Sequence, residues 1–125
     1  MHRKLIVSFK VQYFNKNLVL DIFRNLATFT PTHFRKNKIE KEWNDKSDIQ
    51  NIFSDISVSD SLFIKGNDWD YFSVNQIGNG RIFFSIEILW KETESRDINI
   101  SISTWAKNKG FISAYLVNAE YEYVQ

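Results

Sequence analysis

Residues 81–90 constrain the fold more than any other segment of the chain. Every even-numbered position from 82 to 90 is apolar, in the order Ile, Phe, Ile, Ile and Trp, whereas Ser85 and Glu87 interrupt the odd-numbered positions. Because successive side chains of a strand point to opposite faces of a sheet, this alternation indicates one dry face and one wetter face. We therefore expect residues 81–90 to form a central strand.

Two segments nearer the start of the chain also show clear periodicities. In residues 4–14, Leu5 and Val7 begin an apolar series that alternates with polar residues, which predicts a first strand with one buried face. Residues 17–28 carry apolar side chains at helical spacing, and Pro31 then prevents the helix from continuing. The apolar stripe is wide, so this helix is expected to lie on the sheet.

The next part of the chain contains a second helix and one region with two interpretations. Ser47 and Gln50 form a capping-box pattern ahead of an apolar i, i+3, i+4, i+7 series, which predicts a short helix over residues 48–56. In residues 32–46 the apolar spacing fits either a helical turn or a loose hairpin around a Lys-Asn-Lys sequence. Both interpretations stay open from the sequence.

The second half of the chain is a series of apolar segments separated by turn residues. Residues 58–65 could hold a short strand, and the Gly-Asn-Gly sequence at 78–80 is the clearest hairpin loop, because Gly and Asn tolerate positive φ. A four-stranded antiparallel meander is predicted from residues 69–77, 81–90, 98–105 and 111–124.

The alternation also predicts how these strands pair. We expect Val74 opposite Phe84, Ile86 opposite Ile102, and Ile102 opposite Tyr115. A one-residue slip would exchange the two faces, so burial specifies this register. The expected core face comprises Phe72, Val74, Ile82, Phe84, Ile86, Ile88, Trp90, Ile98, Ile100, Ile102, Tyr115, Val117 and Ala119. The expected open face carries Ser73, Asn75, Ser85, Glu87, Asn99, Ser101, Ser103, Asn118, Glu120 and Glu122, with Phe83, Trp105, Ile112 and Leu116 as apolar exceptions.

These patterns together predict an α+β fold in a single domain spanning residues 1–125. We expect an antiparallel sheet of about five strands with two helices on one face, in the order β-α-α-β-β-β-β. The first strand shares the two-faced pattern and should join the same sheet, at an edge that the sequence does not specify.

Composition excludes several classes of protein. Sixteen Lys and Arg against fifteen Asp and Glu leave a formal net charge of +1, so no global charge attracts nucleic acid or anionic lipid. Cysteine is absent, which excludes disulfides and thiolate sites and suits a reducing compartment. Ser8 and Lys10 break the first apolar run too early for a signal peptide, and no run approaches the ~20 residues of a membrane span. We expect a cytoplasmic protein that binds neither nucleic acid nor membrane.

No catalytic or cofactor motif is present in the sequence. His2 and His33 lack the spacing of a zinc site or of a catalytic triad. Glu87 is expected to face Ser101 and Ser103 on the open face, where a concavity lined by carboxylates could do acid–base chemistry. Polar residues on a solvated sheet face explain the same pattern more simply. We therefore expect no enzyme, no cofactor and no metal site.

One segment departs from the even charge balance of the chain. Residues 48–70 contain five Asp residues against Lys65 alone, together with aromatic residues. An acidic stretch with aromatic anchors is typical of a surface that binds a basic protein, because charge speeds encounter and aromatic side chains supply burial. Aspartates that serve only as caps and turn residues explain it equally well. The predicted partner-binding residues are Asp55, Asp60, Asp68, Trp69, Asp70, Tyr71 and Trp43.

The size, the composition and the last residues of the chain together indicate a resemblance to one class of proteins. The chain is small, free of cysteine and of catalytic motifs, rich in Asn, Ile, Lys, Phe and Trp, and ends on the aromatic sequence Glu-Tyr-Glu-Tyr-Val-Gln at residues 120–125. In these features it resembles the immunity proteins of bacterial polymorphic-toxin and contact-dependent growth inhibition systems. The resemblance implies a cytoplasmic protein that binds one cognate toxin domain and blocks it, and it assigns no site residue.

Two other function classes are compatible with the sequence. A small-ligand-binding protein or an enzyme would need a closed pocket on the polar sheet face around Glu87 and Ser101. A structural or assembly subunit would use its edge strands and an aromatic patch to form a homo-oligomer. The sequence predicts neither the oligomeric state nor the identity of a toxin.

Overall fold

The computed structural model describes residues 2–27, 29–67, 69–77, 82–91 and 111–118 of the 125-residue chain. Within these residues the chain forms seven strands, two α-helices and one short 3-10 helix. In chain order they are β1 (His2–Lys10), η1 (Val11–Tyr13), α1 (Lys16–Leu26), β2 (Pro31–Lys36), β3 (Ile39–Glu42), α2 (Asp45–Ser54), β4 (Leu62–Gly66), β5 (Tyr71–Ile77), β6 (Phe83–Lys91) and β7 (Phe111–Asn118).

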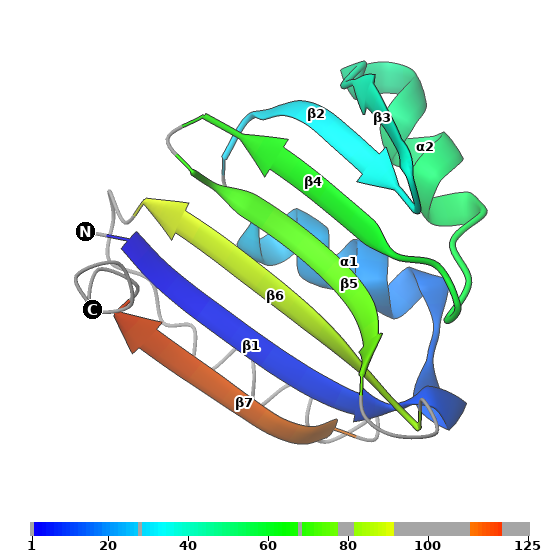
Figure 1. Ribbon diagram of the computed structural model, residues 1–125, viewed down its shortest axis with the longest axis vertical. Helices are drawn as coiled ribbons and strands as arrows, with labels where there is room; N and C mark the ends of the chain where they lie inside the picture. The colour runs from blue at the N-terminus through cyan, green and yellow to red at the C-terminus, as the bar shows by residue number, and fades with distance from the viewer. Residues whose placement is uncertain (1, 28, 68, 78–81, 92–110, 119–125) are drawn as a thin grey trace.

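The seven strands form one antiparallel sheet in the order β3-β2-β4-β5-β6-β1-β7. In the view of Figure 1, α1 runs behind this sheet. Phe23 of α1 and Phe53 of α2 contact each other and both contact Phe72 of β5, with ring centroids 5.1 to 6.3 Å apart. Both helices therefore cover the same face, and the predicted α+β class with two helices on one face of an antiparallel sheet is confirmed.

Residues 31–42 form a hairpin, which resolves the region that had two interpretations. β2 and β3 pair from His33 opposite Glu42 to Lys36 opposite Ile39. Asn37 in the connecting loop has φ 57°, the left-handed value that Asn tolerates and that tight hairpins require. The hairpin refines the expected order and strand count, because it adds two strands between the helices. All four residues of β3 are exposed, so this strand lacks the apolar alternation that marks the others.

β1 lies inside the sheet, between β6 and β7, and not at an edge as expected. Leu5, Val7 and Phe9 are at most 1% exposed. Its neighbours on both sides come from distant parts of the chain, so no short turn indicated them. Burial of one strand face shows that a strand is covered, but it does not show how many neighbours that strand has.

The register of β5 and β6 differs from the predicted register by two residues. Val74 lies opposite Ile86 and not opposite Phe84. On its other side Ile86 pairs with Val7 of β1, in the position expected for Ile102, which lies outside the described residues. A two-residue shift leaves each side chain on its predicted face, because the side-chain period of a strand is two. The alternation therefore predicted the faces correctly and the pairs wrongly.

β7 pairs with β1, whereas its predicted partner, Ile102, lies outside the described residues. In β7, Tyr115 lies opposite Ile6, whereas Leu116 lies opposite the buried Leu5.

Burial agrees with the predicted core face except at one described position. Ile82 is 53% exposed, because β6 begins only at Phe83 and Ile82 lies beyond the last paired residue. Ser73 and Ser85, which were expected on the solvated face, are each only 6% exposed, since neighbouring strands flank these small side chains on both sides. The members of the predicted core face that are at most 2% exposed are Phe72, Val74, Phe84, Ile86 and Ile88.

Both predicted helices are present, with shifted ends. α1 begins after Asn15, whose side chain accepts a backbone hydrogen bond at 2.7 Å as a typical N-cap. α2 begins after Asn44, which lies ahead of the predicted cap at Ser47. The Asn44 N–H donates to the Asp48 carboxylate, so an earlier turn than the predicted one starts this helix.

Replacing Ile86 by Ala should lower the free energy of unfolding by about 2–5 kcal/mol, because a truncated Ile that is 0% exposed leaves a cavity. Ile82→Ala is the matched control, and its half-exposed side chain should change the free energy of unfolding by less than about 1 kcal/mol. Urea unfolding of the two variants measures the difference. Equal losses would contradict the observed burial of this strand.

Candidate functional site

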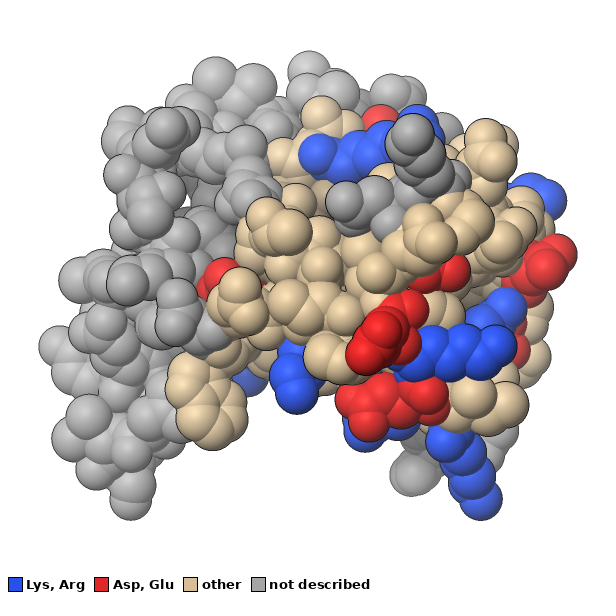
Figure 2. All heavy atoms as spheres, turned by 90° about the horizontal axis from the view of Figure 1, so that it is seen from above, with Lys and Arg blue, Asp and Glu red and all other residues tan. Residues whose placement is uncertain are grey.

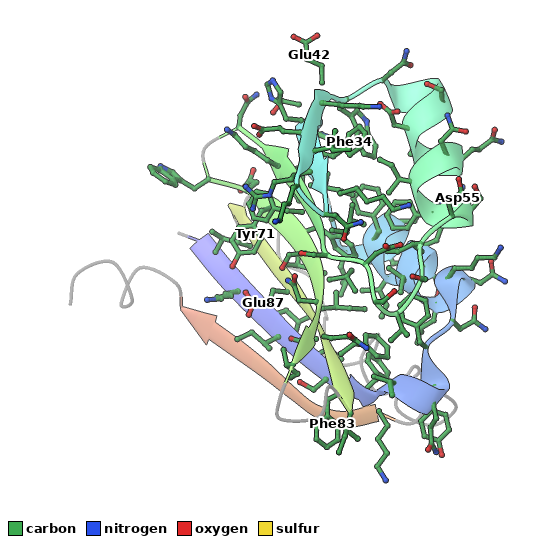
Figure 3. The ribbon with its side chains drawn as sticks, turned by 45° about the vertical axis from the view of Figure 1, so that its right-hand side comes forward. Phe34, Glu42, Asp55, Tyr71, Phe83 and Glu87 are labelled. Carbon is green, nitrogen blue, oxygen red and sulfur yellow. The ribbon has the colours of Figure 1, made fainter. Side chains whose placement is uncertain are left out.

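The sheet face opposite the helices carries a row of side chains across four strands. The register places Arg35 of β2 opposite Phe63 of β4, Phe63 opposite Ser73 of β5, and Ser73 opposite Glu87 of β6. Directly opposite residues share one face of a sheet. Figure 3 shows Tyr71 and Glu87 on the side of the sheet away from the helices. We call this side of the sheet the open face.

Four side chains on the open face form a chain of contacts. The Arg35 guanidinium carbon lies 5.3 Å from the centre of the Phe63 ring. Phe63 stacks on Tyr71, with ring centroids 5.2 Å apart and planes 23° apart. The Tyr71 hydroxyl donates a hydrogen bond to a Glu87 carboxylate oxygen at 3.0 Å. Cation–π and aromatic contacts of this kind contribute about 0.5–1.5 kcal/mol each, so these side chains are held in place before any partner arrives.

The loop between β4 and β5 presents Trp69 to solvent. The Gly66 N–H donates to the Asp70 carbonyl at 2.8 Å, and the Asp70 N–H donates to the Asn67 carbonyl at 3.1 Å, so the loop is closed by its own backbone. Trp69 has φ 74° and is 80% exposed. A left-handed conformation costs a residue with a side chain about 1–2 kcal/mol. Neither the strain nor the exposure stabilises the folded chain, and such features concentrate at functional positions.

Gly66 holds the start of this loop against the segment that precedes β2. A Cβ atom at Gly66 would lie 2.5 Å from a ring carbon of Phe29 and 3.1 Å from the Thr30 carbonyl oxygen. These distances leave no room for a side chain, so only glycine allows this close approach. The tip that carries Trp69 is therefore anchored at its base.

A hollow of about 730 Å³ lies beside Trp69 on the open face. The stacked aromatic pair Phe63 and Tyr71 belongs to its lining, together with two cationic and two acidic side chains. Figure 2 shows acidic and basic side chains next to one another on the end of the molecule seen from above. The complete lining is Arg35, Glu40, Phe63, Lys65, Gly66, Asn67, Trp69, Asp70 and Tyr71. Aromatic residues surrounded by mixed charges are typical of a surface that binds another protein.

The structure brings three of the predicted partner-binding residues together and separates others. Trp69, Asp70 and Tyr71 all line the hollow, and Asp68 lies outside the described residues. Asp55 follows the last turn of α2, where Figure 3 shows it among the helices and away from Tyr71. The acidic stretch therefore does not form one surface, because β4 carries the chain from one end of the sheet to the other.

Asp60 has a structural role in the connection between α2 and β4. Its carboxylate accepts hydrogen bonds from the Ser57 N–H at 2.9 Å and from the Asn37 amide at 3.3 Å, and the Lys36 ammonium lies 3.8 Å away. Burial by itself raises the pKa of Asp60, but these hydrogen bonds and the Lys36 charge outweigh it and hold the pKa below the ordinary carboxyl value. Asp60 thus ties this connection to the β2–β3 hairpin.

Trp43 belongs to the core on the helix side. Its ring centroid lies 6.0 Å from that of Phe23 in α1 and 6.0 Å from that of Phe34 in β2. The side chain is partly buried and packs against the main apolar cluster. Trp43 is therefore placed to stabilise the fold and lies apart from the hollow on the open face.

Sequence reasoning missed Arg35 and Glu40 as members of the hollow. In the sequence both belong to a stretch of alternating charges with no feature that marks either residue. Arg35 reaches Phe63 because β2 pairs with β4, and Glu40 lies opposite Arg35 because β3 pairs with β2. The signal is thus a cross-strand register, which no local pattern contains.

Neither metal ligation nor similarity to known proteins assigns a function to this chain. Within the described ranges, no group of three or more His, Cys, Asp or Glu could hold a metal ion, and no helix has both the length and the apolar character to cross a bilayer. Ser101 and Ser103, which were expected near Glu87, lie outside the described residues. No protein family model, curated protein or solved structure matches this chain. Any function must therefore be argued from the geometry.

Asp60→Ala should lower the free energy of unfolding by about 1 kcal/mol at pH 7, because it removes the acceptor of two hydrogen bonds. The pKa of Asp60 is lower in the folded chain than in the unfolded chain. Its contribution is therefore present above the unfolded pKa of about 4 and is lost as the pH falls through the folded pKa. Urea unfolding at pH 7, 5 and 3 should show the gap between wild type and variant shrinking in acid. For Asp55→Ala, whose carboxylate is exposed, the gap should stay near zero throughout.

Trp69→Gly should raise the free energy of unfolding by up to about 1 kcal/mol, because glycine adopts a φ of 74° without strain. Thermal unfolding of the wild type and the variant measures the change. A clear loss of stability would show instead that the Trp69 ring packs against its own sheet and contributes to the fold.

Proposed function

We propose that this chain is a toxin-neutralising immunity protein, which binds a cognate bacterial toxin domain and blocks it. The observation that carries the proposal is Trp69, a large aromatic side chain that is 80% exposed at a left-handed φ beside a hollow with an aromatic lining. Tryptophan is among the residues most enriched at the energetic centres of protein interfaces. The resemblance in size and composition to bacterial immunity proteins supports the choice of partner.

The anchored loop favours binding by a pre-formed surface. Two backbone hydrogen bonds close the loop that carries Trp69, and the neighbouring Phe63 and Tyr71 rings are already stacked. Ordering a mobile side chain on binding costs about 0.5–1.5 kcal/mol. Because these groups are ordered before the partner arrives, more of the contact energy is available as affinity.

Charged residues around the hollow favour selectivity for one partner. Arg35 and Lys65 supply cations, and Glu40 and Asp70 supply carboxylates, within the same lining. Rim charges mainly change the association rate and penalise partners whose charges do not match. The described part of the acidic stretch contributes only Asp70 to this rim. The proposed contact area is therefore centred on Trp69, Asp70 and Tyr71.

The proposed place of action is the cytoplasm. The chain has no cysteine, which suits a protein that works in a reducing compartment and needs no disulfide to stay folded. An immunity protein acts in the compartment where the toxin domain would damage the cell that carries both proteins.

A second candidate function is the binding of a small ligand in the hollow. Its volume of about 730 Å³ falls within the range of about 300–1,000 Å³ that is usual for ligand sites. A tryptophan that is 80% exposed, however, adds nothing to an enclosed ligand site. Protein binding explains the exposure of Trp69, and ligand binding does not.

The test is co-expression with a toxin domain encoded beside this chain, with growth and binding kinetics as readouts. The wild type should restore growth and bind the toxin domain directly. Trp69→Ala should weaken binding by about 2 kcal/mol, or about 30-fold, as expected for an interface hot spot. Tyr13→Ala is the aromatic control. Tyr13 is also exposed, at 44%, but it follows the C-terminal end of β1, at the other end of the sheet from the loop that carries Trp69. Equal binding by both variants would place the interface elsewhere, and absence of any neutralised toxin would overturn the proposed function.

A further inference from the structure

The outer edge of β3 is a second surface with a defined chemistry. Among the described strands, β3 and β7 are the two edges of the sheet. β3 pairs with β2 on one side, and all four of its residues are exposed. Its sequence is Ile-Glu-Lys-Glu, and Glu40 also lines the hollow beside Trp69. This edge is therefore continuous with the surface proposed to bind a partner.

The directions of the backbone groups in β3 follow from one hydrogen bond and the strand register. The Trp43 N–H donates to the Thr32 carbonyl at 2.9 Å, and in an antiparallel ladder the bonded pairs recur at every second residue. Ile39 and Lys41 therefore direct their backbone N–H and C=O groups toward β2. The groups of Glu40 and Glu42 point away from β2, toward the outside of the sheet.

A hydrogen bond on the other side of β2 gives an independent check of this assignment. The Asn37 N–H donates to the Ser61 carbonyl at 2.7 Å. The pairing of His33 with Lys65 and of Arg35 with Phe63 continues that ladder, so the odd-numbered residues of β2 bond to β4. Its even-numbered residues must then bond to β3, which agrees with the first assignment. The edge thus offers two outward N–H groups and two outward C=O groups.

The side chains of β3 determine which types of residue a strand added at this edge should carry. Glu40 and Glu42 lie opposite Arg35 and His33, so they share the open face, whereas Ile39 is on the helix side and is 63% exposed. Residues directly opposite each other on neighbouring strands contact one another, and like charges there are destabilising. An incoming strand should therefore place basic residues opposite the two glutamates and an apolar residue opposite Ile39.

The same geometry argues against a second copy of this chain at the edge. In an antiparallel pairing of two β3 strands that keeps the open faces on the same side, each Glu lies opposite a Glu. Charged edge strands are a common protection against such self-association. The charges that repel a second copy would attract a basic strand.

We propose that the outer edge of β3 binds a strand of the partner protein whose residues opposite Glu40 and Glu42 are Lys or Arg. This inference rests on the proposed function only in taking the partner to be a protein, and it names the chemistry of that partner. The partner strand extends the sheet through backbone hydrogen bonds, which supply affinity, and its alternate side chains supply specificity. Placed there, its basic side chains lie next to the hollow that Glu40 lines.

The probe is a hairpin peptide closed by a disulfide, in which Lys alternates with Val along one strand. A second peptide with Glu in place of each Lys is the charge control. Both peptides are titrated into the full chain labelled with ¹⁵N, and amide spectra and amide hydrogen exchange are recorded. We expect the Lys peptide to bind and to slow exchange at Glu40 and Glu42, and we expect the Glu peptide to bind at least tenfold more weakly.

Two variants at one position separate the backbone contribution from the charge. Glu40→Pro removes an outward N–H without breaking a bond to β2, and the extended backbone accepts proline at an edge. It should weaken binding of the Lys peptide at least tenfold. Glu40→Gln keeps the N–H and removes the charge, so it should weaken binding less and reduce the salt dependence. Because Gln preserves the strand, this second variant remains informative if the proline variant unfolds.

The outcomes distinguish this inference from the proposed function. The peptide titration contains no toxin domain, so failure of toxin neutralisation leaves the peptide result standing. Absence of binding, equal binding of the two peptides, protection at amides outside β3, or unchanged binding by a folded Glu40→Pro variant would each overturn the inference. Protection of Glu40 and Glu42 in the chain alone, through dimer formation, would overturn it as well.

Discussion

The contact between Phe23, Phe53 and Phe72 determines how the layers of this protein are arranged. The ring centroid of Phe23 lies 5.1 Å from that of Phe53 and 5.1 Å from that of Phe72. One side chain of α1 therefore joins the second helix to the centre of the sheet. Aromatic side chains bury more area than any others and dominate the energetics of small cores. Both helices are held by this cluster on one face, and none of the described residues forms a helix on the other face. The location of the candidate site follows from that one-sided packing.

The open face is ordered by its own side chains. Arg35 over Phe63, Phe63 on Tyr71, and Tyr71 to Glu87 form a path that crosses from β2 to β6. Each contact is weak, but together they restrict the rotamers of these long side chains before a partner binds. Less conformational entropy is then lost on binding. The hairpin tip adds Trp69 at the border of this path. The sheet thus supplies a stiff support, and the residues with binding potential lie along its edge and its loop.

Periodicity in the sequence was sufficient for the faces of the central strands and insufficient for their pairing. Val74 and Ile86 were both predicted on the core face, and both are buried. They were not predicted as partners, because a period of two leaves a register ambiguous by any even number of residues. The geometry of the connecting loop selects one of these registers. For β1, whose neighbours lie far along the chain, no loop could make that choice, so its interior position could not be predicted.

The sequence by itself determined the α+β class, the two helices, and the polar and apolar sides of the central strands. These properties depend on local spacing and on the backbone preferences of single residues. Only the tertiary structure decided that Asp60 pairs with Lys36, that Trp43 packs in the core, and that Arg35 and Glu40 line the hollow. The charge and aromatic character of these residues were visible in the sequence, but their neighbours were not. Strand pairing brings together residues that are distant along the chain, and their spacing carries no record of the register that unites them.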